Sequence, residues 1–532
     1  MIVGFRALQT DMLTPMLKIL VIICCLLLNA CLVGPHYKEP LKKVAEHWKK
    51  DSTVVTTART KNIAWWTVFR DPTLTALIQK GYRNNLSLMS AAVRVLQSRA
   101  QLAQSVGSLY PQQQILTGNY TAYRTGGGSL QEVLPSTFQT AMLGFSATWE
   151  IDFWGKYRRA ILANDAAFLA SYAAYDNALV TLIADIATTY IDIRTTEALI
   201  QVTRQNIQVQ SKAVDISESR FNAGETSQLD VEQAKTELFQ TKASLPQYIS
   251  NLQHQKDVLA VLLGTTPDRV NRLLMKKKGI PVAPTRVAVG IPKEALVQRP
   301  DIYQARLQAI TQSEAIGATK ANLFPSFSLA GSFAFSANTI SGNSISDLFN
   351  VSNTNGTAGP TFNWPILNYG QITNAVRTQD AVYQQAVLNY LNVVLKAQQE
   401  VQDNITQFIE AKHAEQLLMI ANRSAIKSTQ LSLIRYKEGE SDYTPVLDSE
   451  RQQLQVQTAL TNAKGNIPKA LVALYRALGG GWQIRGCNDI VPLKIKQEMA
   501  ARTNWGHLLQ QPKHQPAVTT VDRTKELFLP NW

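Results

Sequence analysis

The sequence predicts a mainly α fold with a transmembrane β-barrel, built from two copies of one elongated unit. Two long stretches, from Lys156 to Ala223 and from Gln371 to Glu438, contain neither Gly nor Pro. The signals around the first stretch recur 215 residues later around the second. Each stretch also follows two short segments in which apolar residues alternate with small or polar ones, which is the pattern of β-strands.

The two stretches without Gly and Pro predict two long helices. Gly and Pro are the strongest helix breakers, so their absence favours one continuous helix in each stretch. At about 1.5 Å per residue, each helix would be about 100 Å long. Strict heptads are typical of helices that wind around neighbours. In the first stretch the heptad positions are Leu179, Ile186, Ile193, Ile200, Ile207, Val214 and Phe221.

The flanks of the two stretches show that the chain is an internal duplication. Residues 149–156 match residues 364–371, and both segments place Trp, a later aromatic residue and Gly directly before the stretch. Residues 220–225 likewise match residues 435–440, each with Gly at the end of the stretch. Self-similarity of this kind indicates two copies of one structural unit. We expect the copies at residues 65–266 and 298–480, joined by a linker at 267–297.

The composition argues against a nucleic-acid partner. The 532 residues carry a formal net charge of +14, which raises nucleic acid or an anionic membrane surface as partners. However, the basic residues are scattered, with no run longer than Lys276-Lys277-Lys278, and no nucleic-acid motif is present. Charged residues amount to only 17%, while Gln, Ser, Thr and Asn are plentiful, as suits solvated walls.

The N-terminus predicts an export signal at residues 1–30. The apolar run from Ile19 to Leu28 is too short to span a bilayer and suits a signal peptide. The sequence Leu28-Asn29-Ala30-Cys31 resembles the lipobox of bacterial lipoproteins, in which the Cys is acylated. Leu32 rather than Asp follows it, which favours transfer to the outer membrane. An ordinary signal peptide with a chance Cys is the alternative, and Met12 or Met16 could be the true start.

The cysteines predict a mature chain without an intramolecular disulfide. Cys24 and Cys25 would leave with the signal peptide, and Cys31 would carry lipid, so Cys487 alone would remain. Residues 31–64 then form a lipid-anchored, extended leader.

An entry helix follows, with Asp71 as its N-cap and Pro72 in its first turn. It extends to about Gly107 and is matched by a second at about 299–322.

After each Leu-aromatic-Pro triplet, at residues 109–111 and 323–325, the sequence pattern changes to that of strands. The first hairpin is expected at about 114–150 and the second at about 326–366. Strands of about 10 residues with alternating pattern and aromatic ends are the weak signature of transmembrane β-barrel strands. Two soluble hairpins are the alternative.

The number of strands decides how a barrel could form. One chain offers four strands, which cannot close a barrel, and open sheet edges are not tolerated in lipid. Two chains would supply eight strands around a filled lumen, and three would supply 12 around an aqueous channel. Each hairpin leads directly into a long helix, so the shared barrel should continue as a long helical barrel.

Beyond Gly224 and Gly439 the chain should return as second helices, at about 228–263 and 445–478. These would form two antiparallel helical hairpins whose tips lie far from the membrane. Pro246 and Pro468 fall inside the return helices, where we expect a kink or a break. Residues 481–532 are expected to form an irregular C-terminal tail.

These features together resemble the outer membrane factors of bacterial tripartite efflux systems, specifically the lipoprotein branch of the OprM, CusC and NodT type with its TolC-like fold. The resemblance rests on the lipobox and residues 31–37, the Phe69-Arg70-Asp71-Pro72 entry, and the duplicated Leu-aromatic-Pro and Trp-x4-aromatic-Gly signals. It covers about residues 31–482. It implies a homotrimer in the outer membrane that projects into the periplasm, a periplasmic adaptor (membrane fusion) protein, and an inner-membrane pump of the RND type as partners.

The resemblance also implies roles for the hairpin tips. In this family the tips close the periplasmic end and dock the adaptor, which places Arg220, Gly224, Arg435 and Gly439 at the docking surface. Tyr436 and Asp230 match a Tyr–Asp latch of TolC-type members, and Asp448 matches an inner ring of carboxylates. Ser441 stands where the latch carries an Arg, so a thinner latch is expected.

No enzyme is predicted. The His residues lack metal-ligand spacing, and no nucleophile elbow, phosphate loop or carboxylate pair is present. No cofactor is expected beyond the covalent lipid, and the scattered Met residues do not favour copper or silver export. The predicted function is a passive outer-membrane conduit for drugs or other small toxic compounds. A TolC-type protein-secretion channel, or a lipid-anchored periplasmic coiled-coil scaffold with its hairpins in water, are the alternatives.

Overall fold

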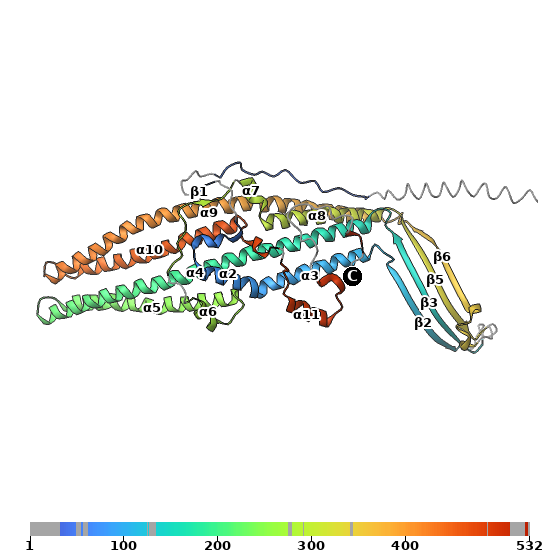
Figure 1. Ribbon diagram of the computed structural model, residues 1–532, viewed down its shortest axis with the longest axis horizontal. Helices are drawn as coiled ribbons and strands as arrows, with labels where there is room; N and C mark the ends of the chain where they lie inside the picture. The colour runs from blue at the N-terminus through green and yellow to red at the C-terminus, as the bar shows by residue number, and fades with distance from the viewer. Residues whose placement is uncertain are drawn as a thin grey trace, which may run out of the picture.

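The structure is a computed structural model that describes residues 32–48, 55–56, 62–124, 126, 135–274, 279–290, 292–340, 344–486, 488–510 and 527–529. An elongated helical body carries a four-stranded sheet at one end (Figure 1). The predicted signal peptide and all four cysteines, including the proposed lipidation site Cys31, lie outside the described residues.

Two helices run along the body and confirm the interpretation of the stretches without Gly and Pro. Helix α4 spans Lys156–Asn222 and helix α9 spans Gln371–Lys437, each with 67 residues. Each begins directly after a glycine in the left-handed region, since φ is 77° at Gly155 and 82° at Gly370. A side chain other than Gly rarely adopts this conformation, so both copies turn from strand to helix on a glycine.

The shorter helices complete each copy of the unit. In the first copy, α2 (Pro72–Asn84) and α3 (Leu86–Gly107) precede the strands, and α5 (Gln228–Leu262) returns from the tip. In the second, α8 (Pro300–Lys320) and α10 (Thr444–Ala477) take these places. Asp71 caps α2 as predicted, accepting from the amides of Thr73 and Leu74 at 2.9 and 3.2 Å. The single entry helix expected here is divided at Asn85, which caps α3.

The helices form one continuous wall. Helices α8 and α10 follow one another between α4 and α9, while α3 and α5 lie beside α4 (Figure 1). Helices α5 and α9 therefore form the two sides of the wall near the tips. The main core lies at the middle of α4, where Leu179, Ile183 and Ile186 are buried against α2 and α10. There Tyr190 donates to Asp71 at 3.0 Å, tying α4 to the cap of α2.

Of the kink or break expected at Pro246 and Pro468, the break does not occur. Helices α5 and α10 both continue through their prolines. A proline removes one backbone hydrogen bond and crowds one carbonyl, but the packing of a long helix can hold the segment together around this defect. Pro468 is itself buried within α10, next to Ile467 in the main core.

Four antiparallel strands form the end sheet in the order β2-β3-β5-β6. They span Gln113–Arg124, Thr137–Ile151, Ser326–Asn338 and Thr354–Asn363. The two hairpins are therefore joined side by side through β3 and β5, and β2 and β6 are the edges. A second, small sheet pairs β1 (Val55–Thr56) in parallel with β4 (Val287–Ala288), linking the leader to the segment between the copies.

The remaining elements are short helices. They are η1 (Asn62–Phe69), α6 (Pro267–Leu274), α7 (Pro292–Val297), η3 (Ala321–Leu323), η4 (Ile345–Asp347), η5 (Val351–Asn353), η6 (Trp482–Arg485), α11 (Leu493–Arg502) and η7 (Gly506–Leu509). The C-terminal tail, expected to be irregular, therefore contains three short helices, η6, α11 and η7, among its described residues. Arg485 pairs with the buried Asp176 of α4 at 2.7 Å, and Arg99 of α3 donates to the Leu508 carbonyl at 2.6 Å. These polar contacts add to apolar packing, since Val491 and Met499 of the tail lie in the main core.

Candidate functional site: the end sheet and the hairpin tips

The strand register gives the end sheet two chemically different faces. Residues directly opposite one another in antiparallel strands point to the same face. One face is apolar and includes Leu116, Leu143, Phe145, Trp149, Leu329, Phe333, Phe335 and Phe362. The other is mostly small and polar, despite Ile115, Met142, Tyr123 and Phe138, and includes Thr117, Thr140, Ser146, Thr148, Ser328, Ser332, Asn355, Thr357 and Thr361.

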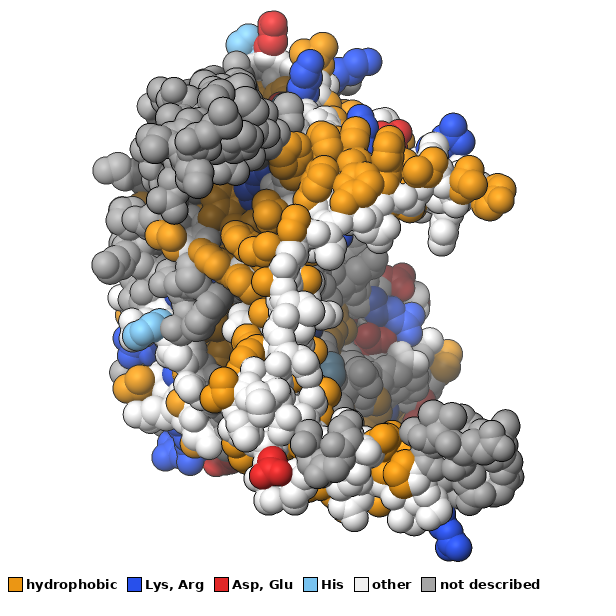
Figure 2. Space-filling view, turned by 90° about the vertical axis from the view of Figure 1, so that its right-hand side faces the viewer, with side chains coloured by type: hydrophobic (Ala, Val, Ile, Leu, Met, Phe, Trp, Pro, Cys, Tyr) orange, Lys and Arg blue, Asp and Glu red, His pale blue; other side chains and the backbone are white. Residues whose placement is uncertain are grey.

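Both faces are solvent-accessible in the single chain, and only one of them suits water. Phe145, Phe333 and Phe362 are 47%, 48% and 60% exposed. Hydrophobic side chains gather in bands in the view onto the strand end of the molecule, and most charged side chains lie toward its edges (Figure 2). The strands contain 12, 15, 13 and 10 residues, enough for tilted strands to cross a hydrocarbon layer. This arrangement suits lipid on one face and water on the other.

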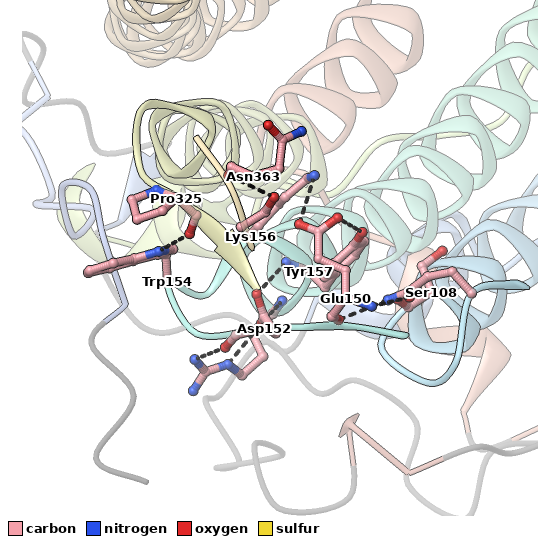
Figure 3. Close-up of polar contacts among 11 residues, drawn as sticks. Ser108, Glu150, Asp152, Trp154, Lys156, Tyr157, Pro325 and Asn363 are labelled. Carbon is pink, nitrogen blue, oxygen red and sulfur yellow. Dashed lines mark hydrogen bonds and ion pairs between the residues drawn. The ribbon is translucent and has the colours of Figure 1, made fainter. Parts of the chain in front are cut away.

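The junction between sheet and helices is fixed by polar contacts in the first copy (Figure 3). The Asp152 carboxylate accepts from the amides of Tyr157 and Arg158 at 3.1 and 3.0 Å, at the start of α4. The N-terminal amides of a helix lack partners inside the helix and favour a negative charge. Glu150 accepts from Lys156 and the Tyr157 hydroxyl at 3.2 and 3.0 Å. The direction in which α4 leaves the sheet is therefore well defined.

The hairpin tips of the two copies are built alike. At the first tip, the Glu225 amide donates to the Arg220 carbonyl and the Gly224 amide to the Phe221 carbonyl, both at 2.9 Å. This is a Schellman motif, which requires a left-handed residue after the helix, and φ is 77° at Gly224. Arg435, Gly439 and Glu440 repeat it at the second tip, where φ at Gly439 is 80°. Both arginines also approach the glutamate after the turn at 3.4 Å.

Tyr436 lies at the contact between the two hairpins, but its partner differs from the predicted one. Its side chain is fully buried, and its hydroxyl donates to Ser217 of α4 at 3.3 Å rather than to Asp230. Arg220 donates to the Tyr436 carbonyl, and its guanidinium lies over the Tyr436 ring, 4.7 Å from the centroid. Within the described chain, Tyr436 therefore contacts α4 rather than Asp230, and the latch role expected for Tyr436 and Asp230 stays a prediction.

Asp230 is occupied by its own helix. Its carboxylate accepts from the hydroxyls of Thr226 and Ser227 at the start of α5. An acidic residue in the first turn is favoured by the helix dipole and by such local hydrogen bonds. This local role explains why Asp230 does not reach Tyr436. Asp448 is exposed in the single chain, and the carboxylate ring predicted for it stays a prediction because it needs further copies.

A buried carboxylate pair near the tips was missed by the sequence analysis. Glu450 is 2% exposed and accepts from the Tyr443 hydroxyl at 3.1 Å. Glu237 of α5, which is 5% exposed, pairs with Arg451 at 2.8 Å. The pKa of Glu450 is raised to about 7, mainly by burial. The hydrogen bond from Tyr443 opposes this rise, and the nearby Glu237 charge adds to it. A partial signal was present in the sequence, because Glu450 follows the apolar Val446 and Leu447 by about one helical turn.

Among the residues that the structure describes, no group of three His, Cys, Asp or Glu side chains could hold a metal ion. One described helix, α4, is long and apolar enough to cross a membrane by composition, but 61% of its most apolar window is buried inside the protein. It therefore behaves as a core helix. The features left to carry function are the two-faced sheet and the packed tips.

Comparisons with known proteins place both features in one context. The model of the family described as "Outer membrane efflux protein" matches residues 77–265 and 291–480. Nodulation protein T of Rhizobium leguminosarum bv. trifolii is 28% identical over 460 residues, covering 86% of this chain and 96% of its own. The outer membrane protein OprJ of Pseudomonas aeruginosa is 26% identical, covering 88% and 96%. Among solved structures, the outer-membrane channel OprN is 26% identical with a TM-score of 0.77, over 85% of this chain and 100% of that one.

Proposed function

Because the chain belongs to the outer membrane efflux protein family, we propose that this outer-membrane efflux channel works as a trimer within a tripartite efflux system. Three copies would close one barrel in the membrane and one helical tube in the periplasm. The tube would be a passive conduit for drugs or other small toxic compounds. This is channel function, and the proposal assigns no catalytic residue to the chain.

The observation that carries the proposal is the two-faced sheet with two open edges. The outer sides of β2 and β6 have no strand beside them within the described chain. Unpaired backbone groups at such edges are not tolerated in lipid. Joining β6 of one copy to β2 of the next would pair both edges, turn the Phe-rich face to lipid, and enclose the Ser- and Thr-rich face around water. With three copies this closes at 12 strands.

The helical wall supports the same assembly independently. Helix α9 exposes Leu388, Leu395, Leu417 and Ile420, and helix α5 exposes Leu229, Phe239, Val258 and Val261. These two helices lie on opposite sides of the wall, so contact between α9 of one copy and α5 of the next would be a head-to-tail interface that closes a ring. Such exposed apolar side chains along a helix mark a protein contact.

The periplasmic partners follow from the position of the tips. We propose that Arg220, Gly224, Arg435 and Gly439 form the surface that an adaptor protein binds, with an inner-membrane pump of the RND type behind it. The relatives differ in what their names state: one is a cation efflux system protein of Escherichia coli, and another is a toluene efflux pump protein of Pseudomonas putida. The range of substrates would be set mainly by the pump.

Two further sites belong to this proposal. Cys31 would carry the covalent lipid, including palmitate, that anchors the leader in the outer membrane. The gate would lie at the tips, where Tyr436, Ser217 and Arg220 join the hairpins of one copy and Asp448 of three copies would form a ring of carboxylates. Such a ring repels anions and binds cations. Asp230 would contribute by fixing the start of α5.

Conductance of the purified protein in planar bilayers tests the proposal. We expect a trimer that migrates more slowly before heating than the monomers that heating releases, and that conducts ions in small, rare openings while its tips are packed. A scaffold with hairpins in water would be monomeric in mild detergent, would be extracted by carbonate, and would not conduct. A protein-secretion channel would conduct as well, and neighbouring genes for an adaptor and a pump would argue for efflux.

A further inference from the structure

The leader lies along the helical body as an ordered strap. From Leu32 to Trp48 it follows α8 and α9 away from the sheet (Figure 1). Glu39 pairs with Arg306 of α8 at 3.3 Å and accepts from the Tyr390 hydroxyl of α9 at 3.2 Å. Farther along, the Ala45 amide donates to Gln398 at 3.0 Å. These contacts hold the middle of the strap, and its first residues are held differently.

The first three described residues of the leader are held by one buried arginine. Arg159 of α4 is 1% exposed. Its Nε donates to the Val33 carbonyl at 3.2 Å, and its Nη2 lies 3.5 Å from the Leu32 carbonyl and 3.3 Å from the Gly34 carbonyl. Its Nη1 pairs with Glu314 of α8 at 2.6 Å. A single guanidinium therefore contacts three consecutive leader carbonyls and both copies of the unit.

The buried charge of Arg159 has all its hydrogen-bond partners only with the leader in place. A buried charge is costly unless it is paired and its remaining hydrogen-bond donors are satisfied. Glu314 accepts from one nitrogen of Arg159, and leader carbonyls accept from the other two. Without the leader, those donors would lose their partners. The surface around Arg159 between α4 and α8, here called the receptor, thus presents donors that match a peptide backbone.

Close glycine contacts complete the receptor. Gly34 has φ of +109°, and a Cβ there would lie 2.5 Å from the Gly317 Cα of α8. A Cβ on Gly317 would lie 2.7 Å from the Val33 carbonyl and 2.8 Å from Arg159 Nε. Real Cβ atoms essentially never approach backbone so closely, so the leader can dock here only because both positions are glycine.

The positions related to this receptor by the duplication carry none of its parts. By the alignment of the copies, Asn374 stands in place of Arg159, Ala100 in place of Glu314, and Ala103 in place of Gly317. The chain has one N-terminus and therefore needs one receptor. The parts that differ are the parts that touch the leader, which indicates that they serve the leader rather than the helical wall.

The receptor also lies where the membrane should begin. The Val33 amide donates to the Trp154 carbonyl at 3.2 Å, directly before α4. The Trp154 ring stacks on Phe324 at 4.7 Å, beside Phe153 and Phe327 at the foot of the strands. Aromatic clusters of this kind are typical of the level where a barrel meets the lipid head groups.

We propose that Arg159, Glu314, Gly34 and Gly317 form a docking site for the chain's own mature N-terminus. The site holds Leu32, Val33 and Gly34 at the expected periplasmic edge of the membrane and ties the two copies of the unit together below the barrel. Docking itself does not require lipid. The statement that the docked end carries acyl chains into the adjacent leaflet rests on the proposed lipidation of Cys31.

Limited trypsin digestion of the purified trimer tests the docking site, followed by mass spectrometry of cleavage after Lys38. Gly317→Ala should speed this cleavage roughly tenfold or more, because the strap can no longer seat and opens locally more often. Ala is the better helix former, so faster cleavage could not come from a weaker α8. Arg159→Met combined with Glu314→Gln should act alike while leaving no buried charge.

Two matched controls and one separate label make the test decisive. His36→Ala, at an exposed leader position, and Asn374→Met, at the counterpart of Arg159, should leave the cleavage rate unchanged. Unchanged cleavage in Gly317→Ala and in the double variant would overturn the docking site. Palmitate labelling reports on lipidation alone: slow cleavage without label would keep the docking site and remove the lipid role, whereas label with fast wild-type cleavage would remove the docking site and keep the lipidation.

Discussion

The two copies of the duplicated unit share one architecture and differ in where they find their packing partners. Helix α4 of the first copy is buried along most of its length, between α3, α5, α8 and α10. Helix α9 of the second copy has the same length but exposes Leu388, Leu395, Leu417 and Ile420. Helix α4 is therefore packed within its own chain, whereas α9, like the exposed side of α5, is left for contact with another chain.

The junctions with the sheet show the same difference on a smaller scale. Asp152 and Glu150 anchor the start of α4, but their counterparts in the second copy are Leu367 and Pro365. Leu367 is 81% exposed, and Tyr369, the counterpart of Trp154, is 97% exposed with φ of 48°. A bulky, exposed side chain in the left-handed region is uncommon. The two copies thus share one fold, but after the duplication the long helix α4 became the core and the long helix α9 became an interface.

The largest expected effect comes from charging the interface side of the second copy. Leu388→Glu with Leu395→Glu should prevent trimer formation, because burying an unpaired charge costs about 3–5 kcal/mol. Gln385→Glu with Asn389→Glu adds the same charge about a quarter turn away on α9 and should leave the trimer intact. Size-exclusion chromatography with light scattering in mild detergent measures both. A trimer that survives the Leu variants would mean that α9 does not contact a neighbouring copy.

The next effect is a difference between the two return helices, α5 and α10, in how pH acts on channel opening. Glu450 is buried, whereas its counterpart in the first copy, Lys235, pairs with Glu218 at a partly exposed site at 2.9 Å. Burial raises the pKa of Glu450 to about 7, above the ordinary value near 4.3. The packed tip therefore holds a proton that the open tip releases, so the packed state loses stability as pH rises from about 4.5 to about 7 and then levels off.

Each unit of that pKa difference corresponds to about 1.4 kcal/mol. Opening frequency in planar bilayers should increase between pH 5 and pH 7.5 in the natural protein and should be nearly constant in Glu450→Gln. The groups that face Glu450 are the Tyr443 hydroxyl and the Glu237 carboxylate, the latter paired with Arg451. A pH response that persists in Glu450→Gln would assign the effect to another group.

A smaller effect distinguishes the two tip arginines. Arg220 contacts the Tyr436 carbonyl and ring, while Arg435 is 64% exposed and pairs only with Glu440 among the described residues. Hydrogen bonds from a charged group are worth about 1.5–3 kcal/mol, and exposed ion pairs about 0–1 kcal/mol. Arg220→Ala should therefore open the channel markedly more often, and Arg435→Ala should not. Equal effects of the two variants on conductance would show that the tips are held by another contact.

Patterns that repeat along the chain predicted most of the fold. The absence of Gly and Pro predicted α4 and α9, and alternation in residues 326–335 predicted β5, because local periodicity and backbone chemistry suffice for such elements. The order of the strands in one sheet and the burial of Asp176 by Arg485 were not predicted, because these contacts join residues far apart in sequence. The family resemblance supplied the trimer and the partners, which a single chain cannot display.

At the tips, sequence analysis located the contact but not its chemistry. Tyr436 was correctly placed between the hairpins, yet the choice between Ser217 and Asp230 as its partner depends on a local competition. Asp230 lies three residues after Ser227 at a helix start, where its carboxylate is satisfied by nearby hydroxyls. A capping pattern at Ser227 could have indicated this, and the same reading would have moved attention to Ser217.

The smallest expected effect concerns Tyr436 itself, whose counterpart at the first tip is Phe221, 42% exposed. Tyr436→Phe makes the second tip resemble the first and removes only the hydroxyl bond to Ser217 at 3.3 Å. A neutral hydrogen bond contributes about 0.5–1.5 kcal/mol, while the ring would keep its contacts with Arg220 and Tyr443. Single-channel openings should become several times more frequent, less than for Arg220→Ala. Ser217→Ala should match Tyr436→Phe, and Asp230→Asn should not; the reverse ranking would restore Asp230 as the partner of Tyr436 when the gate is closed.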